Sequence, residues 1–486
     1  MYFCPMAHSD KYEAVIGLEI HAQLSTASKL FCGDATSFGA EPNTHVSPIT
    51  LGHPGTLPKT NTKAVEYAIK MGLACGCSIA EDNYFARKNY FYPDLPKGYQ
   101  ISQHTTPICV GGNVIIKTAE GEKSIQLNRI HLEEDAGKSI HDVSPTHTLI
   151  DLNRAGTPLI EMVTEPCLHS AEDAFLYVTE VRKLVRWLGV CDGNMEEGSL
   201  RCDANVSVRL KGDSVLGTKV EVKNLNSIRN IKKAIEYEIE RLIELKETGG
   251  TIIQQTRSFD ANNDTTFSIR DKEDANDYRY FPDPDLAPFH LTREYIKRIE
   301  ATLPALPATL KKEWKITYGL PDYDIDQLCE HKEEANFYIA WAKQTKQYKA
   351  VANWIIGPIR EYLHETHSSY DTLENTIPYL VELLDLVESG QLNFSVASGK
   401  VFKGIMESPM SPIQYAQENN LLQTNSADEI SNWVDEVLAA NPDKVAEYKK
   451  GKKGLIGLFV GEVKKKSKGK ADPKISTQIL EQKLSQ

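Results

Sequence analysis

The amino-acid sequence predicts an α+β protein in which a large domain with a mixed or antiparallel sheet precedes two all-α regions. Several segments before residue 300 alternate strictly between polar and apolar residues, which is typical of half-buried strands. Amphipathic helical patterns lie between these segments. After residues 303–307, which include two prolines, almost every periodic segment has helical spacing. These observations place the sheet in the N-terminal part of the chain.

The first expected strand, residues 12–24, has an unusual polar face. Glu19, His21 and Gln23 share one face, and the residues between them are apolar. A carboxylate, an imidazole and an amide within one strand form a plausible metal-binding face. An ordinary solvated face fits the pattern too.

Two further segments repeat this pattern. In residues 218–224, Lys219, Glu221 and Lys223 point one way and two valines point the other. In residues 201–209 the five odd positions are polar or charged, and the even positions from 204 onward are apolar. We expect the three strands to line one polar cleft.

Four helices are expected from their periodicity and their ends. One begins at Ser170, where Asp173 completes a pattern similar to a capping box, and ends before Gly189. A second has isoleucine and leucine at helical spacing over residues 231–243 and ends at two glycines, 249 and 250. Two more cover residues 377–387 and 430–438.

Two breaks divide the chain into three expected domains. Prolines 304 and 307 suit neither a helix interior nor a central strand, and two more prolines lie in residues 408–412. We therefore expect domains at residues 1–302, 303–409 and 410–486.

An acidic cluster follows the strands of the first half. Glu133, Glu134 and Asp135 precede a glycine and Lys138, and a divalent cation would relieve the repulsion among the carboxylates. The Gly-Lys-Ser ending is not a phosphate loop, because position 132 is leucine where that motif needs glycine. A surface ion-pair network is the alternative.

Aromatic residues alternate with basic ones in residues 87–100, and more aromatic residues follow at 277–285. Such segments suit the stacking of nucleic-acid bases, although aromatic runs are more often part of a core.

Bulk composition indicates a globular protein of a reducing compartment. The 486 residues are 41% apolar, which is enough for real cores, and the nine cysteines are odd in number and scattered. No signal-peptide pattern and no apolar run of membrane-spanning length is present in the sequence. We expect a cytoplasmic protein that does not enter a membrane.

Charge is distributed unevenly. The net charge of −12 argues against indiscriminate nucleic-acid binding by the whole molecule. The last 46 residues, however, contain twelve lysines and five acidic residues, an excess of seven positive charges. Glycines 454, 457 and 461 suggest close packing of a helix there, and the lysines after them suit a polyanion. The alternative is a merely solvated charged end.

Taken together, these segments closely resemble the family of B subunits of bacterial aspartyl/glutamyl-tRNA(Asn/Gln) amidotransferases, over essentially the whole chain. The resemblance rests on residues 15–21 (VIGLEIH), 38–43 (FGAEPN), 87–94 (RKNYFYPD), 132–139 (LEEDAGKS), 151–161 (DLNRAGTPLIE), 196–203 (EEGSLRCD), 278–282 (YRYFP) and the tail rich in glycine and lysine.

The resemblance implies a fold and an activity. It implies a catalytic cradle related to glutamine synthetase over residues 1–302, then a helical domain, then a helical tail that binds tRNA. The implied enzyme is a ligase with glutamine as amide donor. It uses ATP and Mg²⁺ to phosphorylate the side-chain carboxylate of mischarged Glu-tRNA(Gln) or Asp-tRNA(Asn), after which ammonia displaces phosphate.

The resemblance also implies roles for single residues. The implied metal ligands are Glu19, His21, Glu134 and Glu221, although magnesium prefers oxygen, so that His21 could instead orient a water or accept another divalent ion. The implied catalytic residues are Lys88, near the active site or ammonia path, with Glu134, Asp135, Lys138 and Glu161. The implied tRNA contacts are Lys464, Lys465, Lys466, Lys468 and Lys470. No residue is assigned to adenine.

The sequence departs at one site from the family that it resembles. Many relatives carry a zinc knob formed by a Cys-x-Cys pair and a Cys-x-x-Cys pair. Here Cys32 is followed by Gly33 and Asp34, and the second pair is replaced by Ser47 and Thr50. With three of the four ligands missing, we expect no zinc.

The chain is expected to need partners. It has neither the Gly/Ser-rich signature of an amidase nor an evident glutaminase cysteine. Within the family, ammonia comes from an amidase partner, the A subunit, which is joined by the small C subunit in a heterotrimer. Two other functions fit part of the pattern: a non-catalytic tRNA-binding scaffold, and a free-standing ATP-dependent carboxylate–amine ligase.

Overall fold

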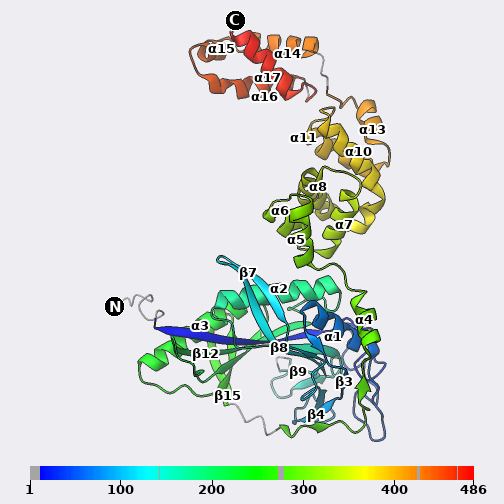
Figure 1. Ribbon diagram of the computed structural model, residues 1–486, viewed down its shortest axis with the longest axis vertical. Coiled ribbons are helices and arrows are strands. Elements are labelled where there is room, and N and C mark those ends of the chain that lie inside the picture. Colours follow the sequence, from blue (N-terminus) through cyan, green and yellow to red (C-terminus); the bar gives the residue numbers. More distant parts are fainter. Residues whose placement is uncertain (1–10, 142, 272–277, 424–426, 468, 486) are drawn as a thin grey trace. The chain divides into compact units, whose positions relative to one another are not determined.

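The computed structural model describes residues 11–141, 143–271, 278–423, 427–467 and 469–485. The chain divides into two compact units, Met1–Leu306 and Pro307–Gln486. The first unit is built around a large sheet, and the described residues of the second form helices without strands (Figure 1).

The sheet of the first unit has 13 strands, with the long strand β1 near its middle. β1 pairs with β11 on one side and with β12 on the other, both antiparallel, whereas β13 and β14 are parallel. The main path runs β15-β14-β13-β12-β1-β11-β8-β5-β4-β16. The strands are β1 (Tyr12–Gln23), β2 (Ser78–Ile79), β4 (Ala86–Asn89), β5 (Tyr99–Ser102), β6 (Cys109–Val110), β7 (Asn113–Thr118), β8 (Gly121–Glu134), β11 (Pro158–Thr164), β12 (Leu200–Leu210), β13 (Val220–Leu225), β14 (Gln255–Asp260), β15 (Thr265–Asp271) and β16 (Phe281–Pro282).

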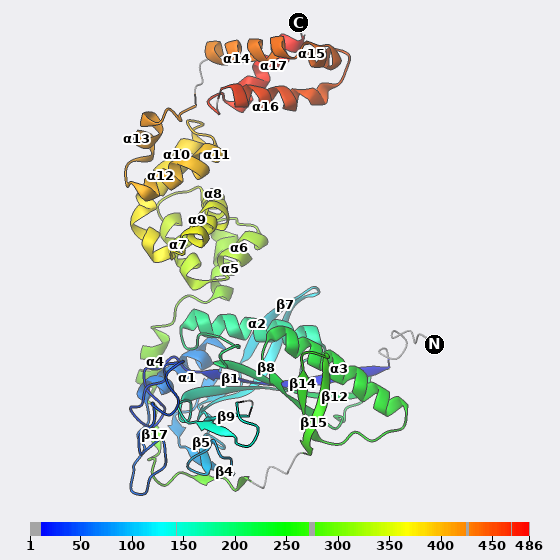
Figure 2. The same cartoon turned by 180° about the vertical axis from the view of Figure 1, so that it is seen from behind.

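Two small ladders and four helices complete this unit. The ladders join β9 (Lys138–Ile140) to β10 (Leu149–Asp151), and β3 (Asp82–Asn83) to β17 (Phe289–His290). Figure 2 shows α2 and α3 along one face of the sheet. The helices are α1 (Thr62–Ala74), α2 (Ala171–Leu188), α3 (Ile228–Glu247) and α4 (Arg293–Glu300).

The two helices that cover the sheet begin and end where their sequences predict. The Ser170 hydroxyl accepts a hydrogen bond from the Asp173 amide at 3.0 Å, and Gly189 ends α2 in the left-handed conformation with φ of 67°. In α3, Ser227 caps the first turn and Gly249, with φ of 74°, follows the last. Both helix predictions are confirmed.

The apolar face of the sheet forms the core with these helices. In β1, Ile16, Leu18 and Ile20 are at most 1% exposed, and they belong to the same core as Val178 and Val181 of α2. Because side chains alternate along a strand, burial of this face turns Glu19 and His21 toward the other side. The polar face of β1 is therefore the one that the helices leave uncovered.

The second unit consists of short helices, among them the predicted α10 and α14. Residues of α14, α16 and α17 share a core cluster of their own, which includes Val434, Phe459 and Leu480. The helices are α5 (Pro307–Thr317), α6 (Asp322–Leu328), α7 (Lys332–Ala342), α8 (Tyr348–Trp354), α9 (Arg360–Thr366), α10 (Ile377–Glu388), α11 (Phe394–Val396), α12 (Phe402–Glu407), α13 (Pro412–Glu418), α14 (Ala427–Ala440), α15 (Pro442–Lys449), α16 (Ile456–Lys466) and α17 (Pro473–Ser485), with π-helical turns at Ile355–Ile359 and Ala397–Val401 and 3₁₀ turns at Tyr370–Thr376 and Lys453–Leu455. Among the described helices, none combines the length and apolar character that a membrane span requires.

Candidate functional site

Strand register brings the polar faces of β1, β12 and β13 together. Glu19 lies directly opposite Asp203 in the pair β1–β12, and Asn205 lies opposite Glu221 in the pair β12–β13. Residues directly opposite each other in neighbouring strands point to the same face of the sheet. The three polar strand faces therefore meet on one side, as the sequence predicts.

The first cluster on this face consists of three carboxylates. One oxygen from each of Glu19, Asp203 and Glu221 lies within 4.8 Å of the others. The Asn205 amide donates to Glu19 at 2.9 Å, and the Lys223 ammonium contacts Asp203 at 2.5 Å and Glu221 at 3.4 Å. We call these three carboxylates the carboxylate group. Hard oxygen ligands in this number suit a divalent cation.

The carboxylate group carries electrostatic strain. Burial raises the pKa of Glu19, and the nearby charges of Glu161, Asp203 and Glu221 raise it further. Burial disfavours the charged form of Lys223, but Asp203 and Glu221 outweigh it and hold the pKa of this lysine above its ordinary value. One lysine thus opposes three carboxylates, and a bound cation would relieve the remaining repulsion.

The second cluster lies two residues further along β1. His21, Glu133 and Glu161 each offer one ligand atom, and these atoms lie within 4.8 Å of one another. The Nε2 atom of His21 is 3.6 Å from Glu161 and 4.0 Å from Glu133. We call this set the histidine group. Its nitrogen and oxygen donors suit several divalent transition metals as well as magnesium.

A second histidine supports the histidine group. The Nε2 atom of His131 lies 3.3 Å from Glu161 and 3.5 Å from Glu133. Burial alone would lower the pKa of His131, but the two carboxylates raise it to about 9. In return, although burial opposes the charged form, the imidazoles of His131 and His21 hold the pKa of Glu161 well below its usual range. Glu161 is therefore ionised at neutral pH.

Lys88, in β4, is half-buried close to the histidine group. Its Nζ atom lies 4.9 Å from the centre of the Tyr278 ring and 5.7 Å from that of Tyr90. Burial opposes its charge, but Glu133 and the nearby tyrosines raise the pKa of Lys88 above its ordinary value. Lys88 thus carries a positive charge at neutral pH and is no general base there.

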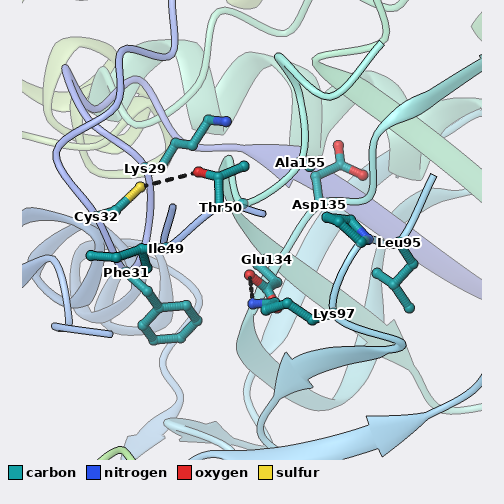
Figure 3. A pocket seen from close by; sticks show the side chains of 12 residues that line it. Lys29, Phe31, Cys32, Ile49, Thr50, Leu95, Lys97, Glu134, Asp135 and Ala155 are labelled. Carbon is teal, nitrogen blue, oxygen red and sulfur yellow. Dashed lines mark hydrogen bonds and ion pairs between the residues drawn. The ribbon is translucent and has the colours of Figure 1, made fainter. Parts of the chain in front are cut away.

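Glu134 does not lie in a cluster with Glu19, His21 and Glu221, the residues with which it was expected to bind a metal. Lys97 contacts its two oxygens at 2.5 and 2.7 Å, and the Ile101 amide donates to it at 2.9 Å. Figure 3 shows this pair in a small pocket that also contains Cys32 and Thr50. The expected metal set of Glu19, His21, Glu134 and Glu221 is therefore not one cluster, because side chains alternate along β8 and turn Glu133 toward the polar face.

Asp135 is the centre of a buried ion-pair network. Its carboxylate accepts hydrogen bonds from Gln23 and from Arg201, both at 2.7 Å, and Arg154 lies 3.8 Å away. Burial opposes ionisation, but Arg201 and Arg154 hold the pKa of Asp135 below its ordinary value. Asp135 thus orients two arginines and the last polar residue of β1.

A large cavity connects this network to the carboxylate group. Its volume is about 590 Å³, and its lining includes Arg154, Arg201, Asp203 and the exposed Lys138 of β9. Cavities of this size hold drug-sized ligands and nucleotides. Lys138 and Asp203 therefore face one shared space.

The sequence grouped Glu133 only with Glu134 and Asp135, as carboxylates that a divalent cation could bind, and it assigned no role to His131, Asp203 or Arg201. The spacing did contain a clue, because His131 and Glu133 are two residues apart, as Glu19 and His21 are, and residues two apart in a strand share a face. Arg201 and Asp203 were placed on the polar face of their strand without a role. The pairing of β1 with β12 and of β11 with β8 was needed to join these residues.

Hydrogen bonds connect the segment of residues 32–34, which carries Cys32 and Asp34, to residues 47–50. The Asp34 carboxylate accepts from the Thr50 hydroxyl at 2.5 Å and from the Ser47 amide at 2.8 Å, and Cys32 lies 3.4 Å from the Thr50 hydroxyl. Asp34 thus occupies the centre of a cross-link between residues 32–34 and 47–50.

Lys464, Lys465 and Lys466, among the expected tRNA contacts, lie in the last turn of α16. All three are exposed, and Lys466 makes an ion pair of 2.5 Å with Glu436. Lys470 is half-buried. Lys468 lies outside the described residues.

Each of the two units matches a known family model. Residues 14–297 match the family model described as the GatB/GatE catalytic domain, and residues 336–484 match the model described as the GatB domain. Together the two matches cover most of the chain.

Individual relatives align over nearly the full length. Proteins named as the B subunit of aspartyl/glutamyl-tRNA(Asn/Gln) amidotransferase include one from Geotalea daltonii, 48% identical over 98% of this chain and 99% of its own length. The protein of that name from Chlorobium luteolum is 47% identical over 98% of this chain and 99% of its own. The one from Nitratidesulfovibrio vulgaris is 46% identical over 97% and 99%.

Proposed function

Because this chain belongs to the family of aspartyl/glutamyl-tRNA(Asn/Gln) amidotransferase B subunits, we propose that it activates the side-chain carboxylate of a mischarged tRNA with ATP and then amidates it. It is one component of a ligase that forms a carbon–nitrogen bond. The substrates are Glu-tRNA(Gln), Asp-tRNA(Asn) or both, and the products are Gln-tRNA(Gln) and Asn-tRNA(Asn).

One observation carries this proposal: two metal-ligand clusters lie side by side on the polar face of β1. Glu19 belongs to one cluster and His21 to the other. Residues two apart in a strand are separated by about 7 Å along it. This spacing lets one face hold two charged centres around a phosphoryl group, with Lys223 beside one centre and Lys88 beside the other.

The carboxylate group fits magnesium. Its donors are all carboxylate oxygens, and the pKa of Glu19 is raised by burial and then by the neighbouring carboxylates, whose repulsion a divalent cation would relieve. Glu19, Asp203 and Glu221 would hold the ion, and the ion would supply neutralising charge for the phosphates of ATP. The histidine group fits a second divalent ion, with His21 as a ligand that tolerates metals other than magnesium.

The chemistry requires two steps. The substrate carboxylate attacks the γ-phosphorus of ATP, and the bond to the bridging oxygen breaks with release of ADP. Ammonia then attacks the resulting acyl phosphate at carbon, and phosphate leaves. The carboxylate needs the phosphate because a free carboxylate is a poor acyl donor.

The residues of this chain contribute charge and orientation. Lys88 and Lys223 remain protonated and stabilise negative charge as it develops on the transferring phosphoryl group. Glu161 remains ionised, held by His131 and His21, as a charged member of the histidine group. Asp135 fixes Arg201 at the wall of the cavity, where Lys138 adds further positive charge.

Glu134 has a different proposed role from the metal ligands. Together with Lys97 it lines a small pocket on the other side of β8. We assign this pair to the catalytic unit as a positioning element, separate from the carboxylate group.

Ammonia is proposed to come from partner proteins. Burial raises the pKa of Cys77 to about 11 and that of Cys191 to about 12, so these thiols carry little thiolate at neutral pH and are poor glutaminase nucleophiles. Since the relatives are named as the B subunit of an amidotransferase, we infer that an amidase, the A subunit, and a small C subunit join this chain in a cytoplasmic heterotrimer.

The domain layout remains part of the proposal. We propose a catalytic cradle of the glutamine-synthetase type at residues 1–302, a helical domain at 303–409 and a tRNA-binding tail at 410–486. The core shared by α14, α16 and α17 supports a tail that packs by itself. Lys464, Lys465, Lys466, Lys468 and Lys470 are the proposed tRNA contacts.

The test uses the complex reconstituted with its amidase partner. Glu19→Gln should abolish ATP hydrolysis that depends on Glu-tRNA(Gln) and Mg²⁺, because it removes one carboxylate from the group. Glu13→Gln is a matched control: Glu13 shares the strand and face but pairs with Arg209 at 2.8 Å outside both clusters. Full activity of Glu19→Gln would overturn the site assignment.

The same assay separates the other functions. A non-catalytic scaffold predicts that neither substitution changes ATP hydrolysis by the complex. A free-standing ligase predicts turnover with small carboxylates and no loss on deletion of residues 441–486. We expect turnover of mischarged tRNA to fall on that deletion.

A further inference from the structure

An exposed aromatic side chain lines the large cavity of the catalytic unit. Phe38 is 73% exposed, and the cavity of about 590 Å³ includes it together with Lys138, Arg201 and Asp203. A single exposed apolar residue is ordinary on a protein surface. This one is distinguished because it shares a cavity with a member of the carboxylate group.

The loop that carries Phe38 is anchored on both sides. Before it, the Thr36 hydroxyl donates to the Thr26 carbonyl, and Ala35 bridges to Ser28. After it, Asn43, in the left-handed conformation with φ of 61°, donates to the Ile150 carbonyl at 2.9 Å. The backbone on both sides of Phe38 is therefore held in place by these contacts.

Further bonds fasten the loop to the segment after β10. The Leu152 amide donates to the Asn43 side chain at 2.8 Å. Asn153 donates to the Glu41 carbonyl at 2.8 Å and accepts from the His45 amide at 2.8 Å. An aromatic ring on an anchored loop can bind a ligand without a large cost in conformational entropy.

The cavity also presents cationic groups with free donors. In the described part of the chain, the ammonium of Lys138 makes no ion pair or hydrogen bond. The Nε atom of Arg201 is buried without a hydrogen-bond partner, while its Nη2 atom is held by Asp135. Buried donors of this kind are normally satisfied, so an acceptor from a ligand is the natural partner.

An aromatic platform beside cationic side chains with free donors is the chemistry of nucleotide binding. Bases stack on aromatic rings, and phosphate or ribose oxygens accept from lysine and arginine. We propose that Phe38 stacks on an adenine base held in this cavity, with Lys138 and Arg201 on its phosphate or ribose oxygens. The inference rests on the proposed function, and it adds the base subsite which that function leaves unassigned.

Two substrates of the proposed reaction carry an adenosine, namely ATP and the 3′-terminal nucleotide of tRNA. The chemistry of recognition is the same for both. Kinetics of the reconstituted complex separate them, because KM for ATP and KM for Glu-tRNA(Gln) are measured with the other substrate saturating.

Phe38→Ala should raise one of these two KM values roughly 5- to 150-fold, the range expected for the loss of one base–aromatic stack. Phe38→Tyr should restore the wild-type value because it keeps the ring. The matched control is Val215→Ala, which removes an apolar side chain that is 77% exposed in the same unit and outside the cavity. A rise in KM for ATP identifies ATP as the source, and a rise in KM for the tRNA identifies its terminal adenosine.

A binding measurement gives a readout besides activity. Phe38→Trp places a fluorophore at the site, and a stacking base should quench it. The probes are Mg²⁺ with a non-hydrolysable ATP analogue, and uncharged tRNA with or without its terminal adenosine. Wild-type KM for both substrates in Phe38→Ala, with no quenching by either probe, would overturn the inference. Failure of the proposed function differs, because the wild-type complex itself would then be inactive.

Discussion

Glu133 and Glu134 are adjacent in sequence yet belong to different environments. Glu133 accepts a hydrogen bond from Ser102 at 3.2 Å and joins the histidine group, whereas Glu134 is bound by Lys97. Because side chains alternate along β8, a shift of one residue moves a carboxylate from the metal face to a separate pocket. Substitution of Glu133 and substitution of Glu134 should therefore have different effects on the protein.

The first prediction uses this contrast. Glu133→Gln should raise the concentration of Mn²⁺ or Mg²⁺ needed for half-maximal activity by about tenfold or more, because it removes a charged ligand from the histidine group. Glu134→Gln should leave that concentration unchanged. Metal titration of the reconstituted activity measures both, and equal shifts for the two variants would contradict the assignment.

The second prediction concerns the pair of Glu134 and Lys97. Their side chains are only 4% and 12% exposed. Glu134→Ala should lower the free energy of unfolding by about 3–5 kcal/mol, because it leaves the Lys97 charge buried without this partner. Urea denaturation measures the change. The double variant with Lys97→Met should recover part of it, and a double variant as unstable as the sum of the two single variants would argue against coupling.

The third prediction concerns the cross-link centred on Asp34. We expect Asp34→Ala to lower the free energy of unfolding by about 1–2 kcal/mol, because the Thr50 hydroxyl and the Ser47 amide lose their acceptor. Chelators should leave the melting temperature of the wild-type chain unchanged, since we expect no zinc at Cys32. A drop in melting temperature on chelation, reversed by zinc, would contradict this.

The same carboxylate predicts a pH dependence. Burial alone would raise the pKa of Asp34, but hydrogen bonds from Thr50 and Ser47 hold it below the ordinary value. A carboxylate whose pKa is lower in the folded state stabilises the fold above its unfolded pKa, about 4. That stabilisation is lost as the pH falls through the lower folded value. Asp34→Asn should remove this component from the pH dependence of urea denaturation.

The last prediction concerns the tail. Lys464→Ala and Lys465→Ala should weaken tRNA binding more than Lys466→Ala, because the ammonium of Lys466 is already paired with Glu436. Each substitution that removes a phosphate contact should also reduce the slope of log affinity against log salt concentration by about one unit. Filter binding of tRNA at several salt concentrations measures both effects. Equal losses for all three lysines would show that the ion pair does not restrain Lys466.

Much of the fold follows from local patterns that can be read along the chain. The period-two alternation of residues 12–24 predicts β1, and Ser170 and Gly189 predict the ends of α2. Such features depend on neighbours within a few residues, so they are present in the sequence itself. The resemblance to a family of amidotransferase components adds the activity and is confirmed by the full-length matches.

The sequence by itself determined which side chains face the polar side of each strand and that a helical region follows the sheet. It named Glu19, His21, Glu161 and Glu221 as site residues. Only the tertiary structure decided their grouping: Glu19 and Glu221 with Asp203, and His21 and Glu161 with Glu133. The reason is physical, because register between strands distant in sequence sets the distances between side chains, and no local pattern encodes that register.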